Sequence, residues 1–123
     1  MATTRATLAE VLTDPAFARM TSLGRRWAAG VAGVLAASGL PWHVTRLGCR
    51  AEYGFAAEPP RDGASAAAAD DFPLQTFLHL HALNRGVLLT PFHNMALMCP
   101  ATSEADVDRH TEAFAAAAAD LTA

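Results

Sequence analysis

The part of the sequence that most constrains the fold lies towards its C-terminal end, where two short apolar runs stand between the end of one helix and the start of another. The runs cover residues 87–89 and 95–98, and their length and composition predict two buried strands. Three polar residues interrupt them, Thr90, His93 and Asn94. Because polar groups are costly to bury without partners, packing alone does not explain these residues, and they are candidates for function.

The first third of the chain predicts two helices. Residues 3–12 form a short candidate, and Asp14 followed by Pro15 predicts an N-cap and the first turn of a second helix. Apolar residues then recur at steps of three or four until Gly39 and Pro41 end the pattern. This stripe consists of Phe17, Met20, Leu23, Trp27, Val31, Val34 and Leu35.

Residues 42–55 change to a period of two, which predicts a pair of strands with a bend or bulge at Gly48. Residues 56–69 are rich in turn-forming and small residues, so we expect a surface loop that could also start a helix. Asp70 or Asp71 then caps the next helix.

Two helices complete the prediction. The first ends before Gly86, and the second opens at Ser103, which has Asp106 three residues on in a capping arrangement. The expected buried face of the first is Leu74, Phe77, Leu78 and His81. The expected buried face of the second is Val107, Thr111, Phe114, Ala118 and Leu121. Helices and short strands in this order indicate one α+β or α/β domain over residues 1–123.

Composition excludes several classes of function. No apolar run approaches the ~18 residues of a membrane span and no signal peptide is evident, so we expect a cytoplasmic protein without membrane contact. The net charge is −3 and the basic residues are scattered, which argues against nucleic-acid binding. All nine basic residues are arginine, so the chain contains no lysine.

The cysteines and histidines offer little chemistry of their own. Cys49 and Cys99 are either one disulfide or, as we expect in a reducing compartment, two small buried thiols. The apolar neighbours of Cys99 predict an inert thiol with a raised pKa. His79 and His81 are two residues apart on a helix and cannot chelate a metal ion together, so no metal is expected.

Two segments carry a family resemblance, LNRGVLLTP at residues 83–91 and ATSEADVDR at residues 101–109. Together with the upstream order of a long helix and the HVTRLG segment at residues 43–48, they resemble the C-terminal end of class III pyridoxal-phosphate aminotransferases. The nearest branch is the glutamate-1-semialdehyde aminomutase type. The resemblance covers nearly all of this chain but only the last quarter to third of such an enzyme.

The resemblance implies the small C-terminal domain of a fold type I enzyme, an α+β (or α/β) domain with a small, mostly antiparallel sheet of three to four strands covered by about four helices. The Schiff-base lysine and the phosphate-binding loop of that family lie in the large domain. Pyridoxal phosphate is therefore expected in the complete enzyme and not on this chain alone. The implied partner is a large domain or subunit that carries the lysine, and the complete enzyme is implied to be a homodimer.

The resemblance also suggests roles for individual residues. Asn94 stands about where aminomutase-type relatives place a glutamate that faces the active site. The arginine that many class III enzymes use on the last strand is missing here, and Arg50 is our candidate for that role, because a guanidinium binds a carboxylate in a bidentate manner. The alternatives are that Arg50 is solvated or ion-paired and that His93 and Asn94 only hydrogen-bond a turn.

The favoured hypothesis is a domain that closes the substrate pocket of an aminotransferase or aminomutase, present as a fragment or as part of a split enzyme. Without lysine, such a chain is expected to be inactive by itself. The alternative is a non-catalytic interaction or dimerisation module derived from the same domain. A domain of this kind is expected to expose an apolar patch, with Trp42, Phe92 and Met95 as candidate members.

Overall fold

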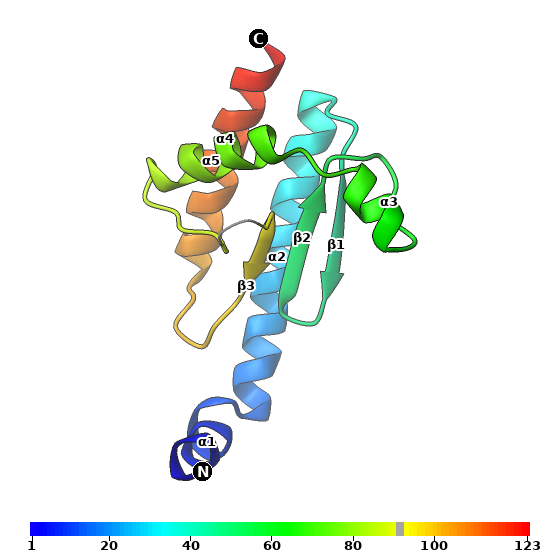
Figure 1. Cartoon of the computed structure of the whole chain (residues 1–123). Coiled ribbons are helices and arrows are strands. Elements are labelled where there is room, and N and C mark those ends of the chain that lie inside the picture. The colour runs from blue at the N-terminus through cyan, green and yellow to red at the C-terminus, as the bar shows by residue number, and fades with distance from the viewer. Residues whose placement is uncertain (91–92) are drawn as a thin grey trace.

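The computed structural model describes residues 1–90 and 93–123, which form an α+β fold around a three-stranded sheet (Figure 1). Its elements in chain order are α1 (Ala2–Ala6), the short π-helical turn η1 (Thr7–Val11), α2 (Asp14–Ser38), β1 (His43–Leu47), β2 (Arg50–Gly54), α3 (Gly63–Ala68), α4 (Phe72–Leu83), β3 (Met95–Leu97) and α5 (Glu104–Thr122). The predicted fold class is confirmed. No helix in the described ranges is long and apolar enough to cross a membrane.

Helix α2 begins and ends at the predicted signals, with one correction at its start. The cap is Thr13, whose hydroxyl accepts a hydrogen bond from the backbone N–H of Ala16, and Asp14 is the first helical residue instead. Gly39 ends the helix in the left-handed conformation, at φ 72°. Met20, Trp27 and most of the predicted stripe are buried, whereas Phe17 is exposed.

The sheet has the order β1-β2-β3, and both neighbouring pairs are antiparallel. Gly48, with φ 59°, lies in the turn between β1 and β2, so the bend predicted there is a full reversal of the chain. The register places Val44 opposite Tyr53, and Ala51 opposite Ala96, on the inner face. All three strands therefore contribute small or apolar residues to the core.

Helices α2 and α5 lie on the inner face of the sheet, and the opposite face is open towards the viewer in Figure 1. The centre of the core is aromatic. The ring of Tyr53 lies 4.8 Å from Phe114 and 6.0 Å from Trp27, measured between centroids. These large side chains provide buried volume in a chain in which much of the apolar content is alanine.

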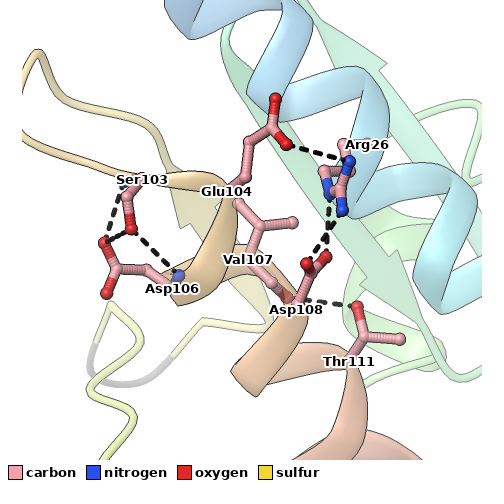
Figure 2. A network of polar contacts seen from close by, with 7 residues as sticks. All are labelled: Arg26, Ser103, Glu104, Asp106, Val107, Asp108 and Thr111. Carbon is pink, nitrogen blue, oxygen red and sulfur yellow. Dashed lines mark hydrogen bonds and ion pairs between the residues drawn. The ribbon is translucent and has the colours of Figure 1, made fainter.

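Polar contacts at one end of the α2–α5 pair fix the relative position of the two helices (Figure 2). Arg26 on α2 donates two hydrogen bonds of 2.8 Å to the carboxylate of Asp108 and lies 3.3 Å from that of Glu104. Ser103 and Asp106 form the predicted capping box at the start of α5. The helices are close enough that a Cβ on Gly30 would lie 2.5 Å from Oγ1 of Thr111.

One prediction about secondary structure is wrong. Residues 87–89 are not a strand: after Gly86, at φ 77°, the backbone N–H of Val87 bonds to the carbonyl of Ala82 and the segment continues as irregular structure. A strand needs a neighbouring edge, and none of the described strands pairs with this segment. The segment at residues 56–69, expected as a surface loop that could also start a helix, does contain a short helix, α3, which a capping box between Asp62 and Ser65 stabilises.

The buried face of α5 differs in part from the predicted face. Val107 and Phe114 are buried as expected, but His110 is also buried, whereas Leu121 is exposed. The small residues Ala113, Ala117 and Ala118 lie on the same face as His110 and allow a close approach to the core. The prediction from sequence periodicity relied on the larger apolar side chains, such as Leu121. It therefore placed the buried face of α5 slightly away from the face that His110 and the alanines occupy.

Candidate functional site

The open face of the sheet consists of cross-strand rows set by the register. Leu47, Arg50 and Leu97 form one row, and Thr45, Glu52 and Met95 form the next. His43 faces Gly54 in a third row, where the imidazole lies so close that a Cβ on Gly54 would be 2.5 Å from its ring. The face is thus leucine-rich at one end and polar at the other.

A cavity of about 240 Å³ lies at the polar end of this face, where His43, Thr45 and Glu52 line it. A second cavity of about 180 Å³ adjoins it and is lined mainly by α4. Both are lined by Tyr53, Gln75 and Asn94, which come from β2, α4 and the segment before β3. The site is therefore assembled from three elements that are distant in sequence. We call the two cavities together the Asn94 site.

Asn94 is buried in this site, with 7% of its surface exposed. Its backbone carbonyl accepts a hydrogen bond of 3.2 Å from the N–H of Tyr53, which fixes the residue beside β2. No hydrogen bond of its side-chain amide to another described residue is present. An amide of this kind offers two donors and one acceptor to a bound molecule.

The two halves of the Asn94 site differ in polarity. The smaller cavity has apolar lining from Phe72, Leu80 and Leu89, and also includes His79 and His93. The larger cavity includes the acidic residues Glu52 and Asp70 together with His43. The side-chain amide of Gln75 donates a 2.8 Å hydrogen bond to Asp70 and so orients one side of the larger cavity.

Tyr53 and His43 are held by their surroundings. Burial raises the pKa of the Tyr53 hydroxyl well above its ordinary value, so the group is neutral over the physiological range. Nδ1 of His43 lies 2.6 Å from the carbonyl oxygen of Ala56, which requires the tautomer with the proton on Nδ1. The site therefore has fixed polar groups suited to positioning a molecule with both polar and apolar parts.

The four residues predicted for the site are Arg50, Thr90, His93 and Asn94, and they do not all lie in the same cavity. His93 and Asn94 line the same cavity, with the His93 side chain exposed and Asn94 buried. Thr90 lines a different cavity of about 330 Å³ between β3 and α5. Arg50 is exposed on the open face and forms a 2.7 Å ion pair with Glu52, which is the alternative considered for it from sequence.

Sequence reasoning missed the contribution of α4 to this site. Gln75, Thr76, His79 and Leu80 all line the smaller cavity. The spacing of Gln75 and His79, four residues apart on a helix, puts two polar side chains on one face and was the available signal. Their role depends on packing against β2 and β3, which the local pattern does not reveal.

Both cysteines are free, and the prediction of buried, inert thiols is wrong for Cys99. Its side chain is exposed, and Thr102 donates a hydrogen bond of 3.4 Å from its hydroxyl to Sγ. This bond and nearby backbone N–H groups lower the pKa of the Cys99 thiol. In the described ranges, no group of three or more His, Cys, Asp or Glu residues is arranged to hold a metal ion.

Comparison with known proteins gives consistent relatives, although no family model matches the chain. A glutamate-1-semialdehyde 2,1-aminomutase from Anaeromyxobacter sp. is 34% identical over 121 residues, which is 98% of this chain and 28% of the relative. The corresponding protein from Opitutus terrae is 34% identical over 106 residues, covering 85% of this chain and 25% of the relative. The chain thus spans about a quarter of the length of these curated relatives.

Solved structures agree with these sequences. A glutamate-1-semialdehyde aminomutase from Pseudomonas aeruginosa PAO1, in complex with PMP, has 49% sequence identity and a TM-score of 0.93 over 95% of this chain and 26% of its own. An omega-transaminase from Sphaerobacter thermophilus has 28% identity and a TM-score of 0.75 over 89% of this chain and 25% of its own.

The fold and these relatives define an aminotransferase-type α+β domain that corresponds to a part of a larger enzyme. The chain is a relative of the C-terminal region of class III pyridoxal-phosphate aminotransferases, on the branch of the glutamate-1-semialdehyde aminomutases. The resemblance predicted from the sequence is confirmed at this level.

Proposed function

We propose that residues 1–123 form one domain that closes the substrate pocket of a pyridoxal-phosphate-dependent aminotransferase or aminomutase. The proposal rests on the match to the P. aeruginosa aminomutase, which covers 95% of this chain. A polar site on an otherwise uncovered sheet face supports it, because such a face can meet a second domain and share a cavity with it. The large domain of this proposal lies outside these 123 residues, on the same polypeptide or on a partner.

The residues of this chain do not suit covalent attachment of pyridoxal phosphate. The attachment requires a primary amine from lysine, and this sequence has none. When bound to the large domain, the cofactor supplies the electron sink for amino-group chemistry. The contribution of this chain is to bind and orient the substrate and to limit access of water, which requires no lysine.

Asn94 is the residue proposed to contact the substrate. Its amide hydrogen-bonds to polar groups without adding charge, and its backbone is anchored to β2 through Tyr53. His93 lines the cavity beside it and is the second candidate. Arg50 is proposed as a carboxylate ligand only if it leaves Glu52, because one carboxylate already occupies its guanidinium. Thr90 is the weakest candidate, since it lines another cavity.

A second candidate function is a non-catalytic interaction or dimerisation module. The observation that favours it is the set of large exposed apolar side chains on the open face, including Leu47 and Leu97. A module of this kind predicts stable self-association of the isolated chain, which sedimentation velocity detects.

A domain-replacement hybrid tests the proposed function. This chain would replace the matched region of the P. aeruginosa aminomutase, and amino-group transfer would be measured against the parent enzyme and against the same enzyme lacking that region. We expect the hybrid to regain measurable turnover, with the truncated enzyme inactive. A folded hybrid that retains the cofactor but has no turnover above the truncated enzyme contradicts the proposal.

A further inference from the structure

We infer that one water molecule binds in the interior between α4, α5 and β2, where it bridges His81 and His110, and that this bridge holds α4 in position beside the Asn94 site. The water site belongs to the core of this chain and does not depend on the proposed function. Its effect on substrate binding rests on that function, and the two are measured separately.

A small cavity lies between these three elements on the covered side of the sheet, with a volume of about 10 Å³. Tyr53 of β2, His81 of α4 and His110 of α5 line it, and the rest of its lining is apolar. This volume is close to the minimum that one water molecule needs, and it leaves no room for a larger ligand.

The two histidines bring unpaired polar atoms to this cavity. His81 is 8% exposed and His110 is 3% exposed. Nδ1 and Nε2 of His81 and Nδ1 of His110 have no hydrogen-bond partner among the described residues. Nε2 of His81 lies 3.3 Å from Oδ2 of Asp120, but not in hydrogen-bond geometry. Because buried polar groups are nearly always paired with protein or with water, the cavity between the two rings is the place for a bound water.

Water suits these rings because it both donates and accepts hydrogen bonds. Burial lowers the pKa of His110 to about 4, so at neutral pH its ring carries one donor and one acceptor nitrogen. Whichever nitrogen holds the proton, a water molecule pairs with Nδ1 of His110 and retains hydrogen-bonding capacity for His81. Tyr53 also lines the cavity, and its hydroxyl is the third candidate partner, which matches the roughly three hydrogen bonds that a buried water makes.

The bridge bears on the position of α4, which packs against α5 (Figure 1). His81 lies near the end of α4, with Leu78 and Ala82 on the same buried face. Gln75 and His79 of this helix line the smaller cavity of the Asn94 site. A water-mediated contact at His81 therefore helps to fix where these two side chains lie, and His81 is a positioning residue for the site.

A double-mutant cycle distinguishes a cavity that holds water from a dry one. His81→Leu, His110→Phe and the double variant would be compared with the parent chain by urea unfolding at pH 8, well above the lowered pKa of His110. With water bound, each single variant is less stable than the parent, because the water and the remaining imidazole each lose a partner. The double variant then loses less stability than the sum of the two single variants. Asp120→Asn, made in the parent and in His81→Leu, corrects for the ion pair with His81.

A dry cavity predicts the opposite sign. Each single substitution then removes a buried imidazole that was already unpaired, so each single variant is more stable than the parent. This result would overturn the inference.

Oxygen-17 magnetic relaxation dispersion counts long-lived internal water molecules without relying on stability. We expect the amplitude to fall by one water molecule from the parent to the double variant. His81→Gln should retain the full amplitude, because its side-chain amide still forms a hydrogen bond with the water. Equal amplitudes for the parent and the double variant would contradict the water site.

The positioning role of His81 is measured in the aminomutase hybrid. His81→Leu is expected to raise KM several-fold with kcat nearly unchanged, and His81→Gln to restore most of the loss, because it keeps the water in place. Equal KM for the parent and His81→Leu hybrids overturns the positioning role and leaves the proposed function standing. A hybrid that folds without turnover contradicts the proposed function alone, because the unfolding and relaxation measurements use the 123-residue chain.

Discussion

The buried histidine of α5 makes stability depend on pH. His110 is 3% exposed, its Nδ1 has no hydrogen-bond partner among the described residues, and burial lowers its pKa to about 4. In the unfolded chain the pKa returns to about 6.5. Between these values the unfolded state binds more protons than the folded state, so stability falls as the pH falls through this window.

We predict a loss of stability of up to about 3 kcal/mol between pH 7 and pH 4 from this residue. Urea unfolding at a series of pH values measures it. His110→Phe keeps an aromatic ring beside Trp27 and removes the titrating group, so this variant should lose most of the slope between pH 6.5 and pH 4. An unchanged slope in the variant would assign the dependence to other groups.

Cys99 is expected to be the more reactive thiol. Its side chain is exposed and its pKa is lowered, chiefly by the hydrogen bond from the Thr102 hydroxyl, whereas Cys49 is half-buried. We predict faster alkylation of Cys99 than of Cys49 at pH 7.5, measured by mass spectrometry. Thr102→Val keeps the shape of the side chain and removes the donor, so the rate at Cys99 should fall several-fold. Cys99→Ser is the control, because any alkylation that remains in this variant occurs at Cys49. Equal alkylation rates for Cys49 and Cys99 would contradict the prediction that Cys99 is the more reactive thiol.

At the scale of elements, the contact of α2 with α5 depends on a glycine. A Cβ at Gly30 would lie 2.5 Å from Oγ1 of Thr111, whose hydroxyl is already bound to the carbonyl of Val107. Gly30→Ala is therefore expected to destabilise the fold by roughly 1–3 kcal/mol. Gly33→Ala is the matched control in the same helix, since nothing lies within 4 Å of its added Cβ, and it should stabilise by roughly 0.5–1 kcal/mol.

Chemical denaturation of both variants measures this prediction. Thr111→Ala combined with Gly30→Ala should recover part of the loss, because the clashing atom is removed. Equal effects at Gly30 and Gly33 would indicate that helix propensity, and not packing against α5, decides the outcome.

Elements governed by local signals were predictable from the sequence. The boundaries of α2 followed from Pro15 and Gly39, and the start of α5 followed from the pair Ser103 and Asp106. The segment at residues 87–89 was not predictable in this way, because its composition suits a strand and only the lack of an adjacent sheet edge prevents one. Local patterns specify helix ends well and strand pairing poorly.

The candidate site was predictable only in part, for the same reason. His93 and Asn94 stood out as polar residues between apolar runs, and the structure places both in one cavity. Gln75 and Tyr53 join them through packing of α4 and β2, which no local pattern encodes. Phe92 lies outside the described residues, and Trp42 and Met95, expected in an exposed patch, are half-buried, with leucines exposed instead.

At the scale of the whole molecule, the sheet has one covered face and one open face. The covered face holds the aromatic core against α2 and α5. The open face holds the exposed side chains of Leu47 and Leu97 at one end and the larger cavity of the Asn94 site at the other. A domain built in this way is suited to act against a second domain, which agrees with the finding that it matches only about a quarter of its relatives' length.

The central claim, that this chain supplies part of a substrate pocket, is tested most directly by the KM of the aminomutase hybrid with Asn94→Ala. Asn84→Ala, at the exposed C-terminal end of α4, is the matched control, and the melting temperature of each variant verifies folding. If Asn94 hydrogen-bonds the substrate, its loss should raise KM by roughly 10-fold, with the melting temperature of the hybrid nearly unchanged. Equal kcat and KM for Asn94→Ala and Asn84→Ala, in hybrids that fold and turn over, would contradict the claim.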